Sequence, residues 1–243
     1  MAISFDENKK IFKLDTAKST YLIGLSPEGY LGHIYYGERL NHPADNYLLR
    51  MAEHPFTPSV NKREKAMFLD FFPEEFPSGG VGGYRESCIN IRDSHGCMGS
   101  EFFYHSHEIY KGKHKLSGLP ASFGTEDEVE TLDIHCRDEV LGLELILSYS
   151  VFEKENILTR SARVVNNGSQ KVRIEKIYSA CLDMDNEDFE MISLHGGWAR
   201  ERHIQQCALH YGKQSVESAR AEISMYLTCP AEKYVFMNCR NGW

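Results

Sequence analysis

The sequence lacks the features that would point to a membrane or nucleic-acid function. No uncharged apolar run approaches the ~20 residues that a membrane-spanning helix requires. Residues 1–10 contain no apolar segment followed by a cleavage site, so no secretory leader is predicted. The formal charge is -8, and no cluster of lysine or arginine forms a stripe that could neutralise phosphates. These absences predict a cytoplasmic protein that binds neither membranes nor nucleic acid.

Recognisable catalytic and metal-binding motifs are also absent. The seven cysteines are odd in number and include no CxxC pair, which argues against a full disulfide framework and a zinc knuckle. We interpret them as reduced thiols. There is no G-x-S-x-G nucleophile motif and no phosphate-binding glycine motif. The residues themselves therefore predict no catalytic residue, no metal site and no cofactor.

A helical apolar period is missing over most of the chain, whereas two-residue alternation is frequent. Leu141–Val151 alternates apolar with mostly small or polar residues and predicts a long strand with one buried face. Further strands are predicted over 84–91, 102–110, 129–136 and 190–194, and short helices only over 44–53 and 217–226. The sequence therefore predicts an all-β fold, a large antiparallel β-sandwich with few short helices, which we expect to form one domain.

Turn residues predict how some of these strands connect. Thr20–Leu25 and Tyr30–Tyr36 flank a type I turn sequence at Ser26–Gly29, which predicts a hairpin. A second hairpin is predicted from 158–164 and 172–182, because an Asn-Gly step lies between them.

The segment from Thr57 to Gly83 is interrupted by three prolines and a glycine cluster. Such a segment cannot continue a regular ladder, and we predict a long surface excursion. Excursions of this length in compact folds are often functional.

Several segments form a recognisable series along the chain. In order, they are Gly29-Tyr30-Leu31, Leu69-Asp70 before Pro73–Pro77, Ser106–Lys113, Leu116–Ala121, Ile157–Arg163 and Trp198–His203. The series resembles the N-terminal region of bacterial α-galactosidases of glycoside hydrolase family 36, in order and spacing, from about residue 10 to about residue 218. The resemblance implies a β-supersandwich domain over residues 1–220, similar in fold to galactose mutarotases.

The same resemblance implies a function for the complete enzyme. In the family, this domain packs on a catalytic (β/α)8 barrel that carries an aspartate nucleophile and an aspartate acid/base. The implied enzyme is a retaining hydrolase of terminal α-linked galactose in substrates such as melibiose and raffinose, and it uses no cofactor. We expect this chain alone to be inactive, because the barrel is absent from it.

The resemblance also implies two substrate contacts. Tetrameric members lend an acidic and a basic side chain from this domain to the active site of a neighbouring subunit. The matching positions are Glu53 and Lys65, where Asp and Arg are more usual in the family. The charge is kept, but the side-chain length and the fork geometry differ.

The segment Trp198–His203 is a candidate interface. As a strand, it would place Trp198, Arg200 and Arg202 on one face and His203 on the other. Two guanidinium groups beside an indole suit a contact with the barrel or a neighbouring subunit. An exposed strand edge with ordinary ion pairs is the alternative.

The resemblance stops before residue 221. Residues 221–243 align with nothing in the family, and we interpret them as a truncated or frame-shifted tail. The last strands of the sandwich would then be missing or replaced, so we expect exposed apolar surface and reduced solubility at this end.

Two other functions fit the same fold class. One is a free-standing carbohydrate-binding module that would use aromatic side chains such as Tyr104, Tyr110 and Trp198. The other is a mutarotase-like epimerase, suggested by fold analogy, which would need His107 or His135 with a glutamate partner.

Overall fold

The strands of the protein are seen in a computed structural model that describes residues 2–41, 48–49, 68–116, 121–184, 189–197, 199–210, 212–216, 224–228 and 234–237. In chain order they are β1 (Ile3–Asp6), β2 (Ile11–Asp15), β3 (Ser19–Leu25), β4 (Leu31–Glu38), β5 (Ile89–Arg92), β6 (Phe103–Lys111), β7 (Glu130–Asp138), β8 (Leu143–Phe152), β9 (Ile157–Asn166), β10 (Arg173–Ile177), β11 (Glu190–Gly197), β12 (Arg200–Ala208), β13 (Ser224–Thr228) and β14 (Tyr234–Met237). All the pairings between these strands are antiparallel. The predicted all-β fold class is confirmed.

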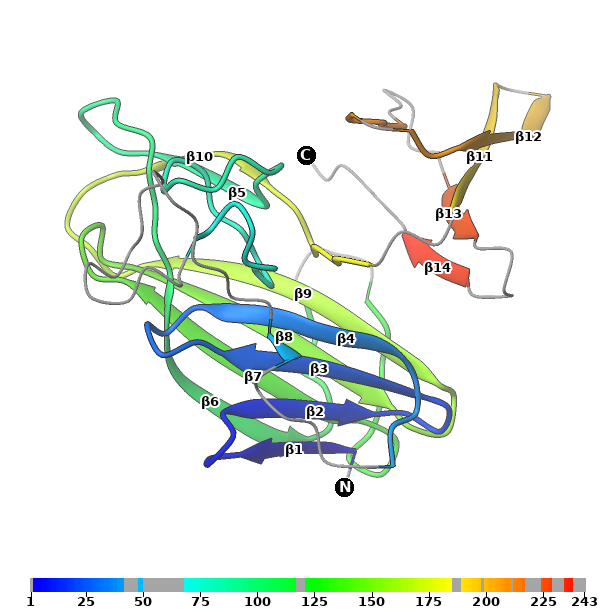
Figure 1. Ribbon diagram of the computed structural model, residues 1–243, viewed down its shortest axis with the longest axis horizontal. Helices are drawn as coiled ribbons and strands as arrows, with labels where there is room; N and C mark the ends of the chain where they lie inside the picture. The colour runs from blue at the N-terminus through cyan, green and yellow to red at the C-terminus, as the bar shows by residue number, and fades with distance from the viewer. Residues whose placement is uncertain are drawn as a thin grey trace. The chain divides into compact units, whose positions relative to one another are not determined.

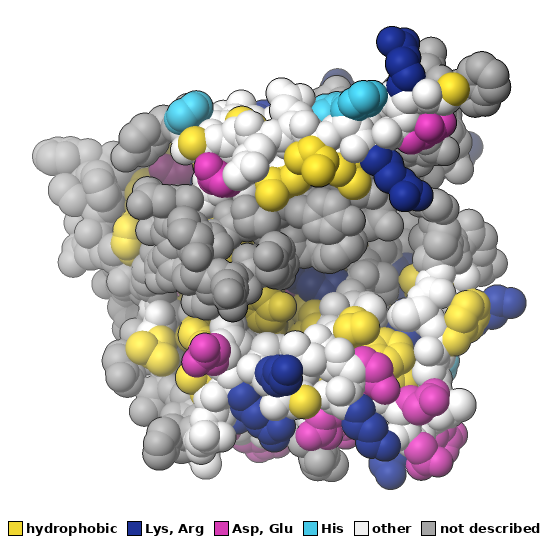
Figure 2. All heavy atoms as spheres, turned by 90° about the vertical axis from the view of Figure 1, so that its right-hand side faces the viewer, with side chains coloured by type: hydrophobic (Ala, Val, Ile, Leu, Met, Phe, Trp, Pro, Cys, Tyr) yellow, Lys and Arg dark blue, Asp and Glu magenta, His cyan; other side chains and the backbone are white. Residues whose placement is uncertain are grey.

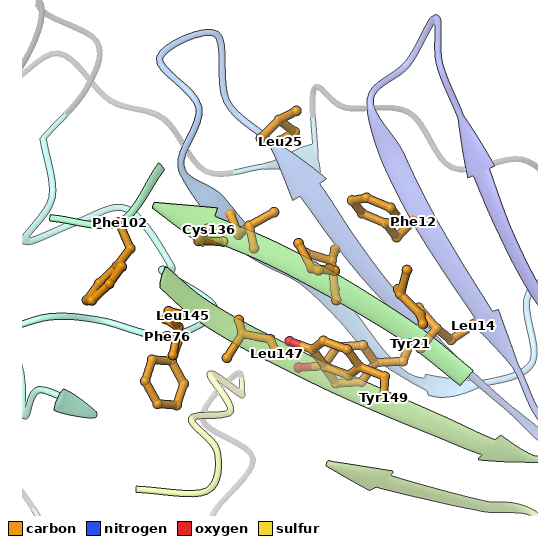
Figure 3. Packing of buried hydrophobic residues seen from close by; sticks show 14 of the residues in the cluster. Phe12, Leu14, Tyr21, Leu25, Phe76, Phe102, Cys136, Leu145, Leu147 and Tyr149 are labelled. Atoms are coloured by element: carbon orange, nitrogen blue, oxygen red, sulfur yellow. The ribbon is translucent and has the colours of Figure 1, made fainter. Parts of the chain in front are cut away.

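The chain divides into two compact units, Met1–Asp183 and Met184–Trp243. In the first unit, a sheet of order β1-β2-β3-β4 stacks on a sheet of order β6-β7-β8-β9 (Figure 1). Buried side chains of both sheets form one cluster, with Phe12 and Tyr21 on one side and Leu147 and Tyr149 on the other (Figure 3). Removing these side chains from water stabilises the stack, which is a β-sandwich.

Two sequence patterns correctly predicted parts of this sandwich. The alternating residues Leu143, Leu145, Leu147, Tyr149 and Val151 of β8 are all buried, as predicted, but Ile146, Ser150 and Phe152 on the opposite face are buried as well, so the expectation of a single buried face is wrong. β3 and β4 form the predicted hairpin, and the Gly29 amide donates a hydrogen bond of 3.0 Å to the Ser26 carbonyl across the turn. Gly29 has a φ of 100°, a conformation that glycine adopts without steric cost.

The second predicted hairpin is wrong. β9 pairs with β8, whereas β10 pairs with β5 in a separate two-stranded sheet. The Asn-Gly step docks on the neighbouring turn instead of closing a hairpin. The Asn167 amide donates to the Gly142 carbonyl at 3.0 Å. Gly168 lies so close to Gly142 that a side chain on Gly142 would not fit. This contact directs the chain away from β9.

The predicted surface excursion is also wrong over its described part, which begins at residue 68. Leu69 and Phe72 are buried in a small second cluster with Tyr30 and Leu49. Glu75 is fully buried, at 0% exposure. The segment therefore enters the interior and brings a carboxylate with it.

The second unit contains a sheet of order β12-β11-β13-β14. β13 pairs with β11, so the helix predicted over 217–226 is wrong at its described end, 224–226. Pairing with a neighbouring strand has overridden the local preference of these residues. The helix predicted over 44–53 lies outside the described residues, apart from Leu48 and Leu49.

The close packing of the 68–72 region on β4 can be tested at Gly32. A Cβ atom added there would lie 2.4 Å from Leu49 Cδ1 and 2.6 Å from Phe72 Cζ. We expect Gly32→Ala to lower the free energy of unfolding by about 1–3 kcal/mol through overpacking. Gly99→Ala is the matched control, because the nearest atom to its added Cβ is the Gly80 oxygen at 3.8 Å. Urea titration measures both variants, and equal stability would contradict the packing.

Candidate functional site

Two of the site residues predicted from the sequence fall within the described part of the chain. Arg200 and Arg202 lie on β12, and both are exposed. Glu53, Lys65 and Trp198 lie outside the described residues, so their roles stay predictions.

β12 is an edge strand of its sheet and contains a β-bulge. Arg200 is opposite Gly197, and His203 is opposite His195, so β12 has one extra residue in this stretch. Because His195 and Gly197 are two residues apart, Arg200 and His203 point to the same side of the sheet. The prediction that placed them on opposite faces is therefore wrong. Arg202 has a φ of 62°, which residues other than glycine rarely adopt.

The surface of β12 combines charge with apolar area. Ile204 is 72% exposed two residues after Arg202. The Glu201 carboxylate accepts a hydrogen bond of 2.9 Å from the Ala199 amide in the adjoining turn. Exposed arginines beside an exposed apolar side chain are typical of surfaces that bind another protein.

Other site classes find little support among the described residues. Figure 2 shows acidic and basic side chains interspersed on the described surface of the face it displays. Within the described ranges, no helical segment is long and apolar enough to cross a bilayer. The same part of the chain holds no cluster of three or more His, Cys, Asp or Glu side chains that could bind a metal ion.

A buried ionic network lies between the two sheets of the first unit. The Glu75 carboxylate accepts hydrogen bonds from Tyr21 OH at 2.7 Å and from Tyr149 OH at 2.8 Å, both at Oε1. Arg160 Nη2 lies 2.5 Å from the same oxygen. His33 Nδ1 is 3.6 Å from Oε2, which is too long for a hydrogen bond. Figure 3 shows the two tyrosines side by side with their hydroxyl groups at the same end.

Arg160 on β9 satisfies several acceptors at once. Its Nη1 donates to Tyr21 OH at 3.0 Å and to the Cys181 carbonyl at 2.7 Å. Its guanidinium carbon lies 5.5 Å from the Tyr21 ring centroid and 5.0 Å from that of Tyr149. A planar group with five donors is suited to this geometry, and a lysine could not reproduce it.

Glu75 stays ionised and the two tyrosines stay protonated, although all three side chains are buried. Burial by itself raises the pKa of Glu75, but Arg160 together with His33 and Tyr21 lowers that pKa below its ordinary value. Burial, followed by the Glu75 charge, raises the pKa of Tyr21 and Tyr149. Glu75 is thus an ionised acceptor, and both phenols are donors. Since Glu75 is 0% exposed, no substrate reaches it, and the network joins segments rather than performing chemistry.

A second carboxylate next to this network behaves differently. Glu74 is 7% exposed, and burial raises its pKa to about 7 although Arg85 acts to lower it. Arg85 is already bound to Asp183, with 2.5 Å between Nη1 and Oδ2, and to the Phe72 carbonyl. Glu74 therefore titrates near neutral pH, because the attraction of Arg85 only partly offsets the effect of burial.

The aromatic residues proposed for a carbohydrate-binding module do not share a face. Tyr104 is opposite the buried Cys136, and its hydroxyl bonds to His107 Nδ1 at 2.8 Å. Tyr110 is on the other side of the sheet, where its hydroxyl donates to Asp133 Oδ2 at 3.2 Å. Tyr104 is thus half-buried and packs against the core, on the face opposite to Tyr110, and the interpretation that grouped the two as one sugar-binding platform is wrong.

The histidines named for an epimerase are in different environments. His107 packs against the rings of Phe5 and Phe12. His135 Nδ1 lies 3.0 Å from Glu144 Oε1, at half-buried positions on adjacent strands. The His–Glu arrangement exists at His135, in the form of a cross-strand pair of the kind that commonly stabilises sheets.

Comparison with known proteins extends over most of the chain. The model of the glycosyl hydrolase family 36 N-terminal domain matches residues 29–228. The chain is 38% identical to the bifunctional alpha-galactosidase/sucrose kinase AgaSK of Mediterraneibacter gnavus, over 92% of this chain and 24% of that protein. It is 33% identical to alpha-galactosidase AgaA of Geobacillus stearothermophilus, over 92% of this chain and 31% of that protein.

Solved structures agree with these sequence relatives. The GH36 alpha-galactosidase AgaB from Geobacillus stearothermophilus superposes with a TM-score of 0.87 and 32% identity, over 95% of this chain and 32% of that one. The galactosidase domain of AgaSK gives a TM-score of 0.87 and 36% identity, over 93% and 32%. The fold thus defines an all-β accessory domain of a glycoside hydrolase.

The chain belongs to the N-terminal domain family of glycosyl hydrolase family 36, which confirms the resemblance noted in its sequence. It spans about a quarter to a third of the length of the relatives named above.

The burial of the Glu75–Arg160 pair predicts how substitutions at these two positions change the stability of the protein. Glu75→Gln leaves the Arg160 charge buried without its counterion, and we expect the free energy of unfolding to fall by about 3–5 kcal/mol. The double variant Glu75→Gln/Arg160→Met removes both charges and should be less destabilised than Glu75→Gln. Glu155→Gln, at an exposed turn, is the control and should change stability by less than about 0.5 kcal/mol. Urea titration would refute the role of the pair if Glu75→Gln matched the control.

The raised pKa of Glu74 predicts how the stability of the protein depends on pH. Its folded pKa of about 7 lies above the ordinary 4.5, so the folded state holds this proton more tightly than the unfolded state. The free energy of unfolding should therefore fall as pH rises from 4.5 to about 7, and this contribution should then level off. We expect Glu74→Gln to remove a decline of up to about 3 kcal/mol across that window. Denaturant titrations at several pH values test this, and an unchanged slope in Glu74→Gln would contradict it.

Proposed function

We propose that the chain serves as the non-catalytic N-terminal domain of an α-galactosidase whose complete form hydrolyses terminal α-D-galactosyl residues in oligosaccharides such as melibiose and raffinose. The observation that carries the proposal is the family match over residues 29–228, in a chain that spans about a third of AgaA. A structure of AgaA from Geobacillus stearothermophilus in complex with raffinose supports the substrate class. The proposed enzyme uses no cofactor.

Two buried carboxylates of this chain support placing the catalytic groups in another domain. A retaining glycoside hydrolase needs two carboxyl groups about 5–5.5 Å apart on either side of the scissile bond. Glu75 is closed to solvent and committed to Arg160, and Glu74 is almost as deeply buried. We therefore assign the nucleophile and the acid/base to a catalytic barrel on which this domain packs.

The β12 edge is the proposed contact with that barrel or with a neighbouring subunit. Arg200 and Arg202 are exposed there and can form bidentate pairs with carboxylates, and Trp198 adjoins them in the sequence. A homotetramer is the proposed assembly of the complete enzyme, with Glu53 and Lys65 contacting substrate in a neighbouring active site.

The cysteines Cys88, Cys97, Cys136, Cys181 and Cys207 are free thiols, which supports a cytoplasmic location.

A free-standing carbohydrate-binding module is the alternative function. It is disfavoured because Tyr104 packs against the core on one face of its sheet, while Tyr110 lies on the other face with its hydroxyl group bound to Asp133. Calorimetric titration of the purified chain with raffinose separates the two functions. Saturable binding would favour the module, whereas an accessory domain should show none.

A domain exchange tests the proposed function directly. We expect AgaA carrying residues 29–228 of this chain in place of its matching segment to hydrolyse an aryl α-galactoside, because the domain supplies the packing surface that the barrel requires. The isolated chain should show no turnover. In the AgaA protein that carries this domain, the double variant Arg200→Ala/Arg202→Ala should weaken the assembly of subunits or domains. Sedimentation velocity measures this change. Substituting an exposed arginine outside β12, Arg173→Ala on β10, is the control. A folded but inactive exchange, or turnover by the isolated chain, would overturn the proposal.

A further inference from the structure

The Asn-Gly step that follows β9 is a chemically reactive sequence at an exposed position. Asn167 and Gly168 are both exposed, in the turn that leads from β9 toward β10. The backbone nitrogen that follows an asparagine can attack the side-chain carbonyl carbon of that asparagine, and glycine hinders this attack least because it has no Cβ. The proposed accessory function does not use this step. Whether the reaction occurs depends on how the turn holds these atoms.

The side chain of Asn166 binds the backbone amide that would react. Its Oδ1 accepts a hydrogen bond of 3.0 Å from the Gly168 amide, and its Nδ2 donates to the Gln170 carbonyl at 2.9 Å. A donor on one side and an acceptor on the other fix the orientation of this side-chain amide. We call these two hydrogen bonds the Asn166 clamp. While the clamp is closed, the Gly168 N–H is engaged and is not free to lose its proton.

Asn167 is held by two further hydrogen bonds. Its backbone amide donates to the Gly142 carbonyl at 3.0 Å, and its side-chain Nδ2 donates to Glu144 Oε2 at 3.3 Å. The turn is also packed closely, because a Cβ atom added to Gly142 would lie 2.8 Å from the Gly168 Cα. The nitrogen that the reaction expels is thus the one bound to Glu144, and its departure breaks that contact.

We propose that Asn167 is a site of spontaneous deamidation that the folded protein keeps nearly unreactive through the Asn166 clamp. When the clamp opens, the Gly168 nitrogen loses its proton and attacks the side-chain carbonyl carbon of Asn167. The side-chain nitrogen leaves with that proton as ammonia, and a succinimide ring remains. Water then opens the ring at either carbonyl, which gives aspartate or isoaspartate. The reaction consumes a water molecule, releases ammonia and requires no oxidant or reductant.

The products do not fit the turn as asparagine does. Aspartate replaces the donor that faces Glu144 with a second carboxylate, and the two like charges repel each other. Isoaspartate adds a methylene group to the backbone where Gly168 is in close contact with Gly142. Both products should therefore weaken the docking of this turn. We expect Asn167→Asp, which reproduces one product, to melt at a lower temperature than the unsubstituted chain.

The test follows both Asn-Gly steps of the full 243-residue chain during incubation in mildly alkaline buffer, with and without urea. Peptide mass spectrometry measures the rate of amide loss at Asn167 and at Asn241, which precedes Gly242 outside the described residues. Because several hydrogen bonds must open together, the rate at Asn167 should be lower without urea by on the order of tenfold or more. Equal rates at Asn167 in both conditions would overturn the proposal.

Substitutions of Asn166 separate the clamp from the general rigidity of the fold. Asn166→Ala removes the acceptor, and the rate at Asn167 without urea should rise by about two- to tenfold, the factor that corresponds to the net contribution of a hydrogen bond. Asn166→Asp keeps an acceptor oxygen and should not raise the rate. Neither variant should change the rate at Asn241, which is the internal reference.

Three outcomes would refute the role of the clamp. They are an unchanged rate at Asn167 in Asn166→Ala, an equal rise in Asn166→Asp, and a rise that is the same at Asn241. The comparison of the unsubstituted chain with and without urea decides the reactivity of Asn167 even if a variant fails to fold.

Discussion

The Glu75–Arg160 ion pair is the constraint on which the first unit depends. Moving an isolated charge into a protein interior costs several kcal/mol, so both groups can be buried only if each meets the other with its remaining bonds satisfied. That condition requires the 68–88 segment, β3, β8 and β9 to converge on one point, since they supply Glu75, Tyr21, Tyr149 and Arg160. Apolar packing tolerates many arrangements of two sheets. The ion pair selects the one in which these donors and acceptors coincide.

The sequence predicted the parts of the fold that local pattern controls. Alternation identified β8 and its more fully buried face, and turn chemistry identified the β3–β4 hairpin. The pairing of β10 with β5 was missed because the Asn167 turn docks on Gly142, a contact with a residue distant in the sequence. The burial of Glu75 was missed for the same reason. The adjacent prolines and glutamates suggest a surface segment. The neighbouring sequence does not show that Arg160, far along the chain, lies in the interior and neutralises one of these glutamates.

The candidate site was predictable to a smaller degree. The resemblance located the interface segment, and two exposed arginines are found in it. Their relative orientation was not predictable from alternation, because the bulge adds one residue to β12. The buried network had a partial signal. Pro73–Pro77 and Ile157–Arg163 both belong to the series of segments that resembles the family, and they contain Glu75 and Arg160. Both partners of the ion pair thus lie in segments that carry the resemblance, but the resemblance assigns them no role and does not show that they meet.

Arg160 also connects the ion pair to the chain that follows β10. Its Nη1 group binds the Cys181 carbonyl, while its Nη2 group faces Glu75. The guanidinium therefore holds the backbone at Cys181 next to the buried carboxylate. A lysine at this position would keep the charge, but a single ammonium could not bind the carboxylate and the carbonyl in these directions at once. The same planar group that makes the buried charge tolerable thereby also fixes the chain that follows β10, and a change in one of these contacts should alter the other.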